Sequence, residues 1–224
     1  MNQETEKQIA AYESVKLVED GMIVGLGSGS TSAYMIKRLG ERVSEGLKIK
    51  GVASSEKTKA LALSVGIEII SLDEAPCIDI NIDGADEFDS YLQLIKGGGG
   101  ALLREKIIAS NAAKNIIIAD SSKEVHRLGK FRLPIETIPF ATGKIISVLE
   151  KKGLDPKLRK TGNEIFSTDE NNYILDLNIA HFTNLAKLQE MLITLPGVVE
   201  TGLFLDTTYE IIVGKETAVL YITK

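Results

Sequence analysis

Residues 22–39 read MIVGLGSGSTSAYMIKRL, and this stretch decides the fold. An apolar strand at Met22–Leu26 runs into three alternating glycines between positions 25 and 29, and a helix follows over Ser32–Leu39. Alternating glycines let backbone N–H groups approach an anion closely, and the helix start adds free N–H donors and the positive end of its dipole. The stretch therefore predicts a strand–turn–helix unit with an anion-binding turn; a strained turn that only caps the helix is the alternative. The candidate binding residues are Ser28, Gly29, Ser30 and Thr31.

The turn matches neither of two common nucleotide-binding motifs. No Gly-Lys-Ser/Thr follows it, as a Walker loop would require. The third glycine falls one position early for a dinucleotide fingerprint, and no acidic residue closes the next strand.

Strands and helices alternate on both sides of this unit. A helix is expected at Lys7–Val18, with Ile9, Tyr12 and Val15 on its apolar side. The other predicted strands are Lys48–Ala53, Ile67–Ser71, Ile78–Ile82 and Asn115–Ala119, and the other helices are Glu56–Val65 and Ala101–Ala113. This alternation, with nearly continuous apolar strands, is typical of a parallel sheet covered on both faces.

The pattern changes near Gly129. The expected strands are Leu133–Ile138, Lys157–Arg159, Tyr173–Leu177 and Val198–Phe204, and the helices are Ala141–Lys152 and Asn184–Leu195. This β-α-β-β-α-β order is that of the ferredoxin-like unit, and Pro134 predicts an edge strand. A final hairpin, Glu210–Val213 with Ala218–Thr223, is expected to return to the first sheet. The sequence therefore predicts an α/β protein with a small α+β domain inserted into a larger one.

Composition narrows the classes of function. The 224 residues carry a formal charge of −5, with no basic tail, so nucleic acid is an unlikely ligand by default. Cys77 is the single cysteine, and it is expected to be a core or structural residue. No secretory signal or apolar membrane span is found, so a reducing cytoplasm is expected. His126 and His181 lie far apart, in no ligand-like spacing, which predicts no metal site.

Two acidic or glycine-rich clusters follow predicted strands. Asp83-Gly84-Ala85-Asp86-Glu87 crowds three carboxylates at a strand end, which shifts pKa values apart and calls for a nearby cation. A solvated acidic turn is the alternative. Lys96-Gly97-Gly98-Gly99-Gly100 runs into a helix, and such a glycine run suits backbone that closely approaches a bound polyol. Glu105, in the first turns of that helix, could exchange a carbon-bound proton in a pocket partly closed from water; alternatively it is a surface residue paired with a neighbouring cation.

The last cluster is Asp120-Ser121-Ser122-Lys123. Lys123 could add positive charge to the same rim or be a solvated helix-start lysine, and Lys7 is a weaker candidate of the same kind. Because the carboxyl ends of parallel strands meet at one edge of a sheet, we expect the four clusters to converge there. Anion donors, paired carboxylates, a lysine and a placed glutamate suit proton abstraction beside the carbonyl of a phosphorylated sugar.

These motifs together resemble the ribose-5-phosphate isomerases of the A type. The resemblance covers essentially the whole chain, and Asp-Gly-Ala-Asp-Glu followed by Lys-Gly-Gly-Gly is highly specific as a pair. It also includes Val52-Ala53-Ser54-Ser55 and residues 196–204. Two positions depart from the family pattern: Ser28 stands where threonine is frequent, and Gly100 where alanine is frequent.

The resemblance implies a Rossmann-like catalytic domain over residues 1–128 and 205–224, with a ferredoxin-like lid over residues 129–204. It implies interconversion of ribose 5-phosphate and ribulose 5-phosphate in the non-oxidative pentose phosphate pathway, with no cofactor, by a homodimer or tetramer. Glu105 would be the base, with Asp83, Asp86 and Lys96 as the other catalytic groups. The substrate would be lined by Ser28, Gly29, Ser30, Thr31, Asp83, Gly84, Ala85, Asp86, Lys96, Gly97, Gly98, Gly99 and Lys123.

Two other readings compete with this one. A sugar-phosphate sensor would belong to a transcription regulator, and the chain has no room for a DNA-binding segment before the first helix. An amino-sugar-phosphate deaminase or a lactonase would be expected to use a histidine near the site, and His126 matches no such motif. A coenzyme A transferase would need a glutamate nucleophile and a larger pocket.

Overall fold

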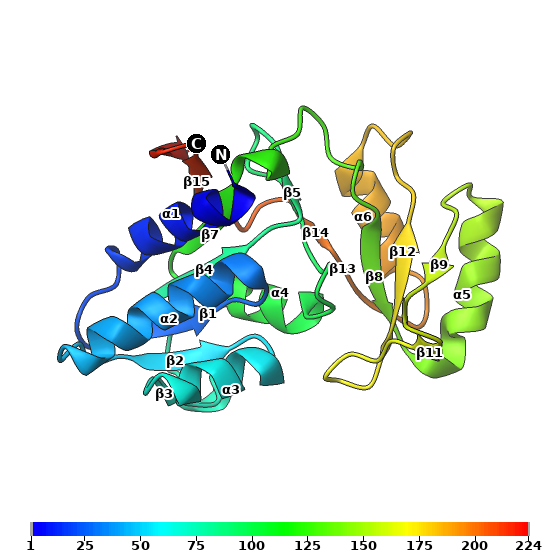
Figure 1. Ribbon diagram of the computed structural model, residues 1–224. Helices are drawn as coiled ribbons and strands as arrows, with labels where there is room; N and C mark the ends of the chain where they lie inside the picture. Colours follow the sequence, from blue (N-terminus) through cyan, green and yellow to red (C-terminus); the bar gives the residue numbers. More distant parts are fainter. Residues whose placement is uncertain (1, 224) are drawn as a thin grey trace.

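The computed structural model describes residues 2–223 and contains a large, mostly parallel sheet beside a smaller antiparallel one (Figure 1). The large sheet has the order β16-β15-β7-β4-β1-β2-β3, and only its β15–β16 edge is antiparallel. Its strands are β1 (Ile23–Leu26), β2 (Lys50–Ala53), β3 (Glu68–Ile69), β4 (Ile80–Gly84), β7 (Asn115–Asp120), β15 (Glu210–Lys215) and β16 (Ala218–Thr223). The final hairpin therefore returns to the first sheet, as predicted.

Helices cover both faces of this sheet. On one face lie α1 (Gln3–Val15), α2 (Ser30–Ser44) and α3 (Glu56–Ser64), which share one apolar cluster with β1, β4 and β7. On the other face, α4 (Leu102–Ser110) packs between the two sheets (Figure 1). Strands are added in one direction from β1 to β3 and in the opposite direction from β4 to β15. The strand order therefore reverses between β1 and β4, which is where open α/β sheets bind ligands.

The smaller sheet has the strand order β13-β8-β12-β9, and all its pairs are antiparallel. It consists of β8 (Leu133–Thr137), β9 (Lys157–Leu158), β12 (Tyr173–Leu177) and β13 (Val198–Thr201). One face packs on α5 (Pro139–Lys151) and α6 (Leu185–Ile193) in a shared apolar cluster, and the other approaches α4. This is the predicted ferredoxin-like arrangement, and the α/β fold class is confirmed.

Pro134 does not mark an edge strand, so that prediction is wrong. Its strand β8 is central and pairs with both β12 and β13. Proline is tolerated there because β13 ends at Thr201 and the next residue, Gly202, donates to the Pro134 carbonyl at 2.7 Å. The Gly202 carbonyl accepts the N–H of Lys96 at 2.9 Å, so it needs no donor from position 134.

Short strands between the two sheets were missed. The predicted strand Val198–Phe204 breaks at Gly202 into β13 and β14 (Leu203–Phe204), and β14 joins β5 (Glu87–Phe88) and β6 (Leu94–Ile95) in a three-stranded sheet. Within the polar stretch of residues 162–172, β11 (Glu164–Ile165) pairs with β10 (Lys160–Thr161). Strands of two residues carry too little periodicity to be recognised in a sequence.

Two expectations about burial were also wrong. Cys77 is exposed rather than in the core. Helix α1 begins at Gln3 and buries the expected Val15, but its other buried positions include Ala10, Ala11 and Ser14, while Tyr12 is 38% exposed. Small side chains face inward because α1 lies very close to α2 and β15. Between residues 2 and 223, no helix is long and apolar enough to cross a membrane.

Gly214 sets the distance between α1 and β15, and replacing it with alanine should destabilise the fold. A Cβ atom at Gly214 would collide with the backbone of Glu6, which cannot move without shifting α1. We expect Gly214→Ala to lose about 1–3 kcal/mol in urea unfolding. Gly143→Ala is the control, since Gly143 lies inside α5 with nothing within 4 Å of a new Cβ. That variant should be neutral or gain about 0.5–1 kcal/mol. Equal effects of the two substitutions would contradict this account.

Candidate active site

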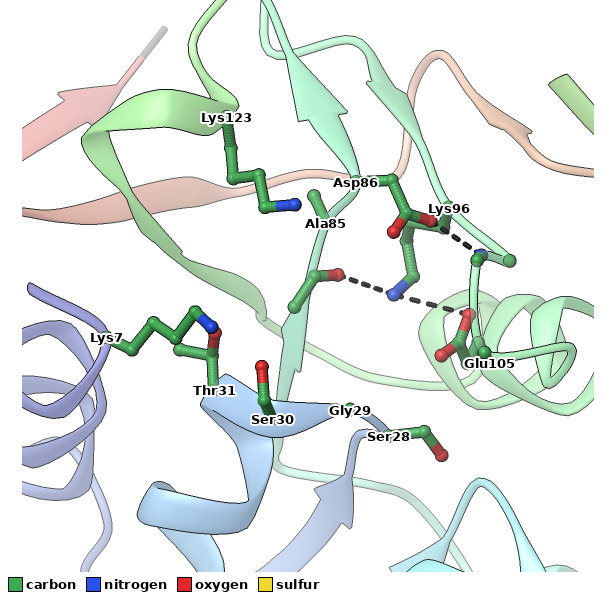
Figure 2. A pocket seen from close by; sticks show the side chains of 14 residues that line it. Lys7, Ser28, Gly29, Ser30, Thr31, Ala85, Asp86, Lys96, Glu105 and Lys123 are labelled. Carbon is green, nitrogen blue, oxygen red and sulfur yellow. Dashed lines mark hydrogen bonds and ion pairs between the residues drawn. The ribbon is translucent and has the colours of Figure 1, made fainter. Parts of the chain in front are cut away.

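A pocket opens at the carboxyl ends of the parallel strands, beside the point where the strand order reverses (Figure 2). It encloses about 540 Å³ of empty space when its open mouth is included. All four sequence clusters reach it, and every candidate residue except Asp83 lines it, together with the weaker candidate Lys7. The lining residues are Lys7, Ser28, Gly29, Ser30, Thr31, Gly84, Ala85, Asp86, Lys96, Gly97, Gly98, Gly99, Glu105 and Lys123.

Lys96 lies at the base of the pocket between two buried carboxylates. Its Nζ is 3.0 Å from Asp83 Oδ2 and 3.3 Å from Glu105 Oε2, and it donates to the Gly84 carbonyl at 2.5 Å. All three charged side chains are at most 6% exposed. Asp83 comes from the end of β4, Lys96 from just after β6, and Glu105 from the first turn of α4. Three separate elements therefore assemble one buried row of charges.

The two carboxylates of this row are not equivalent. Asp83 Oδ1 accepts the N–H groups of Ser28 at 3.1 Å and Gly84 at 2.7 Å, whereas Glu105 Oε2 has no hydrogen-bond partner among residues 2–223. Burial lowers the pKa of Lys96, but Asp83 and Glu105 outweigh burial and hold that pKa above its ordinary value. One cation thus faces two anions, and Asp83 is the carboxylate that accepts more hydrogen bonds.

Burial raises the pKa of Glu105 to about 8, with Lys96 opposing the rise and the charges of Asp83 and Asp86 adding to it. Burial also raises the pKa of Asp83, against the effect of Lys96 and the two backbone donors. A carboxylate with a pKa near neutrality, at the wall of a pocket, is suited to accept and return a proton.

Backbone glycines bring the walls of the pocket together. Gly27 lies against Asp83, where any side chain would collide with the carboxylate. Gly98 donates its N–H to Asp86 Oδ2 at 2.7 Å, as Figure 2 shows, and a Cβ at Gly98 would also strike Asp86. Close approach of the backbone to carboxylates of the protein itself therefore explains these two glycines.

The start of α2 forms the opposite wall. Gly29 caps the helix with φ at 103°, and the first turn contains no acidic residue, so its free N–H groups and dipole favour an anion. Lys7 and Lys123 face this wall from α1 and from the turn after β7 (Figure 2). The two lysines and the helix start together form an anion-binding corner.

Glu6 joins the elements that carry these lysines. Its Oε2 accepts the N–H and hydroxyl of Ser121, at 3.0 and 2.7 Å, and its Oε1 accepts the N–H of Glu216 at 2.9 Å. Glu6 thereby attaches α1 both to the turn that bears Lys123 and to the final hairpin.

The hydroxyl of Ser28 contacts other hydroxyl groups of the protein. Its Oγ lies 2.8 Å from Ser54, 2.9 Å from Ser55 and 3.1 Å from Thr58, in a cluster of hydroxyl groups beside the pocket. The backbone N–H of Ser28 is directed to Asp83 instead. This hydroxyl cluster was missed by reasoning from residue types, although Ser54-Ser55 belonged to the family resemblance.

Lys106 was also missed. Its Nζ contacts Glu200 at 2.8 Å and the carbonyls of Thr201 and Leu203 at 2.6 and 2.8 Å, which attaches α4 to the crossing between β13 and β14. Burial lowers its pKa. Its position directly after Glu105 could have indicated this role. Residues adjacent on a helix point to different faces, so Lys106 can be expected to point away from the pocket that Glu105 lines. Among residues 2–223, no group of three or more His, Cys, Asp or Glu side chains could hold a metal ion.

The raised pKa of Glu105 should make stability depend on pH. The folded pKa is about 8 and the reference value is 4.5, so between these values the folded chain keeps a proton that the unfolded chain has lost. The free energy of unfolding therefore decreases as pH rises toward 8, by at most about 1.4 kcal/mol per pH unit. Glu105→Gln cannot titrate, so its stability relative to wild type should rise over this range and level off above it.

Urea unfolding at about pH 5.5, 7 and 8.5 measures this difference. Glu150→Gln is the control, because Glu150 is exposed on α5 and its substitution should give a difference that stays flat with pH. A flat difference for Glu105→Gln as well would mean that Glu105 titrates near its ordinary pKa.

Comparison with known proteins agrees with this geometry. The family model for ribose 5-phosphate isomerase A (phosphoriboisomerase A) matches residues 50–218. The ribose-5-phosphate isomerase A of Levilactobacillus brevis is 50% identical over 218 residues, covering 96% of each chain. That of Ruegeria pomeroyi is 50% identical over 216 residues, covering 93% of this chain and 82% of the relative. That of Listeria monocytogenes is 47% identical over 220 residues, covering 98% of each chain.

Solved structures show the same similarity along the whole chain. A D-ribose-5-phosphate isomerase in complex with phospho-erythronic acid has a TM-score of 0.96 at 41% identity, covering 100% of both chains. The ribose 5-phosphate isomerase A of Methanocaldococcus jannaschii has a TM-score of 0.95 at 38% identity, also covering 100% of both. With its motifs, fold and relatives in agreement over nearly its full length, the chain belongs to the ribose 5-phosphate isomerase A family.

Proposed function

We propose that the chain interconverts ribose 5-phosphate and ribulose 5-phosphate through an enediolate, a step of the non-oxidative pentose phosphate pathway, with Glu105 as the base. The observation that carries this proposal is the buried Glu105 carboxylate, with a pKa of about 8, at the wall of the pocket and 3.3 Å from Lys96. The names of relatives at about half identity support the same reaction.

The phosphate group of the substrate binds in the anion-binding corner. There the start of α2 offers backbone N–H groups and the hydroxyls of Ser30 and Thr31, and Lys7 and Lys123 supply positive charge. The similar isomerase that was solved with phospho-erythronic acid holds a phosphorylated acid, which supports a phosphorylated sugar as the ligand here. With its phosphate in this corner, the sugar chain extends toward Asp86, Lys96 and Glu105 on the opposite wall (Figure 2).

Ring opening comes first, because the furanose must expose its aldehyde before a carbon-bound proton becomes acidic. A proton leaves the anomeric hydroxyl and another reaches the ring oxygen. We assign this exchange to Lys96 with Asp83 behind it, since Lys96 lines the pocket and Asp83 contacts it at 3.0 Å without lining the pocket itself. Asp83 therefore acts through Lys96. Asp86, which does line the pocket, accepts hydrogen bonds from the sugar hydroxyls or from Gly98.

Proton transfer follows on the open chain. Glu105 removes the proton from C2 of the aldose, and the electrons of that bond form the enediolate, whose negative charge lies on oxygen. Lys96, whose side chain is buried, and the N–H groups of the glycine run stabilise this charge. Glu105 then returns the proton to C1, which gives the ketose.

We further propose that residues 129–204 form a lid domain of their own, supported by the separate apolar cluster beneath the smaller sheet. The assembly expected for the chain is a homodimer, or a tetramer, in the cytoplasm. Light scattering of the purified protein measures this assembly directly.

Glu105→Gln should abolish most turnover and leave binding of the sugar phosphate largely intact. A positioned general base contributes at least about a hundredfold, and glutamine keeps the size and polarity of the side chain. Conversion of ribose 5-phosphate to ribulose 5-phosphate is measured in metal chelator, with Glu150→Gln as the control that should match wild type. A Glu105→Gln variant within tenfold of wild type would remove Glu105 from this role. Binding of the sugar phosphate without turnover in wild type would favour a sensor instead.

Lys7→Met and Lys123→Met should each raise KM for ribose 5-phosphate, by about tenfold, and change kcat much less. The phosphate is bound equally in the ground state and the transition state, so its cations contribute uniform binding. Lys16→Met is a matched control, because Lys16 pairs with Glu13 on the same helix just as Lys7 pairs with Glu4, but lies outside the pocket. Steady-state kinetics of the three variants measure this, and a KM unchanged in both pocket variants would place the phosphate elsewhere.

A further inference from the structure

Arg159, from the smaller sheet, reaches across to the glycine run of the pocket. It follows β9 directly, and its Nη1 donates to the carbonyl of Gly97 at 2.7 Å and to that of Gly98 at 3.1 Å. The other side of the same guanidinium is held by Asp176 of β12, through Nε to Oδ2 at 3.0 Å and Nη2 to Oδ1. The Arg159 side chain is 14% exposed and that of Asp176 is 19% exposed, so this contact is largely shielded from water.

The glycine run has few other interactions to hold it. Gly97 and Gly100 have φ values of 101° and 83°, and a single turn bond joins them, from the N–H of Gly100 to the carbonyl of Gly97. Glycine backbone is the most flexible in a protein, and these residues have no side chains that could pack. Phe166 of the same small sheet region lies against Gly100, and the Arg159 guanidinium lies 5.8 Å from the Phe166 ring. Arg159 is the cation that holds two successive carbonyls of this turn.

Holding these carbonyls also aims the N–H groups on the other side of the same peptides. In a trans peptide the carbonyl and the following N–H point in opposite directions. The carbonyl of Gly97 points to Arg159, and the N–H of Gly98 accordingly points to Asp86, where it donates at 2.7 Å. The carbonyl of Gly98 also points to Arg159, which turns the N–H of Gly99 to the opposite side.

The N–H of Gly99 has no acceptor among residues 2–223, and Gly99 lines the pocket. A backbone donor that is left unpaired at a pocket wall is available to an oxygen of the ligand. A guanidinium bound to the carbonyl of a peptide also polarises that peptide and strengthens its N–H as a donor.

We propose that Arg159, oriented by Asp176, is a positioning residue that aims the Gly99 N–H at the enediolate oxygen. The inference rests on the proposed function, since the charge to be stabilised is that of the enediolate. Arg159 touches no reacting atom in this scheme. Arg159 acts through the two peptide groups whose carbonyls it binds. Through Arg159 the smaller sheet contributes to catalysis although Arg159 does not line the pocket. Nothing in the sequence distinguishes Arg159 from other arginines, because its partners are backbone carbonyls more than sixty positions away.

The test compares Arg159→Met and Arg159→Lys with Arg132→Met. Arg132 is a matched control: it lies in the same smaller sheet, pairs with Asp155 and donates to the carbonyl of Asp176, but does not contact the glycine run. For each variant kcat and KM for ribose 5-phosphate, the inhibition constant of phospho-erythronic acid and the melting temperature are measured. The carboxylate of this acid resembles the enediolate in its planar shape and its charge.

Removal of one oxyanion-hole donor costs about a hundredfold to a thousandfold in kcat, and a donor that is only misaligned should cost about tenfold or more. We therefore expect Arg159→Met to lower kcat about tenfold or more and to raise the inhibition constant of phospho-erythronic acid by a similar factor. KM for ribose 5-phosphate should change less than about threefold. Arg159→Lys keeps one charged donor and should recover part of kcat. If Arg159→Met fails to fold, Arg159→Lys can still be compared with wild type and with Arg132→Met. Arg132→Met should leave kcat and inhibition unchanged.

Three results would overturn the proposal. The first is an Arg159 variant with kcat and inhibition within twofold of wild type. The second is a loss of kcat that also occurs in Arg132→Met and that parallels the decrease in melting temperature of each variant. That result would make the role of Arg159 purely structural. The third is a wild-type protein that does not isomerise ribose 5-phosphate, which would remove the proposed function as well. An active wild type with an unaffected Arg159→Met removes the positioning role alone.

Discussion

Burial of Lys96 between Asp83 and Glu105 is the constraint on which the rest of the structure depends. Two carboxylates and one ammonium are removed from water together, and an unpaired buried charge would be strongly destabilising. The backbone donors of Ser28 and Gly84 satisfy Asp83, so the excess of negative charge falls on Glu105. Burial, with the negative charges of Asp83 and Asp86 adding to it, raises the pKa of Glu105 to about 8. The same charge arrangement that the fold must accommodate therefore gives Glu105 the pKa that the proposed base needs near neutral pH.

The topology of the sheet explains why these charges meet. Residues at the ends of β1 and β4 lie next to each other because these strands pair in parallel at the point where the strand order reverses. Gly27 allows the first of these ends to lie directly against Asp83. Lys96 is held in place by the segment between β13 and β14, where the Gly202 carbonyl accepts the backbone N–H of Lys96. Strand pairing and close contacts of the backbone thus determine where the charged side chains of this edge lie.

The two sheets cooperate through α4 and the glycine run. The smaller sheet packs its apolar face on α5 and α6 and turns its other face to α4, which bears Glu105. Lys106 ties α4 to the crossing between β13 and β14, and Arg159 binds the carbonyls of the glycine run. Arg104 adds a further link, from α4 to Glu56 at the start of α3 and to Glu170 of the smaller domain region. The base and its surrounding backbone are therefore held from both sheets at once.

The sequence by itself determined the order of strands and helices, the class of fold and the clusters that line the pocket. It could do so because local periodicity and glycine-rich turns at strand ends are properties of neighbouring residues. It misassigned Pro134 and part of the buried face of α1, since each depends on what packs against it from a distant segment. Only the tertiary structure decided that Asp83 lies behind Lys96, that burial raises the pKa of Glu105 to about 8, and that Arg159 reaches the glycine run. These outcomes depend on desolvation and on contacts between residues far apart in the chain, and neither has a local signature.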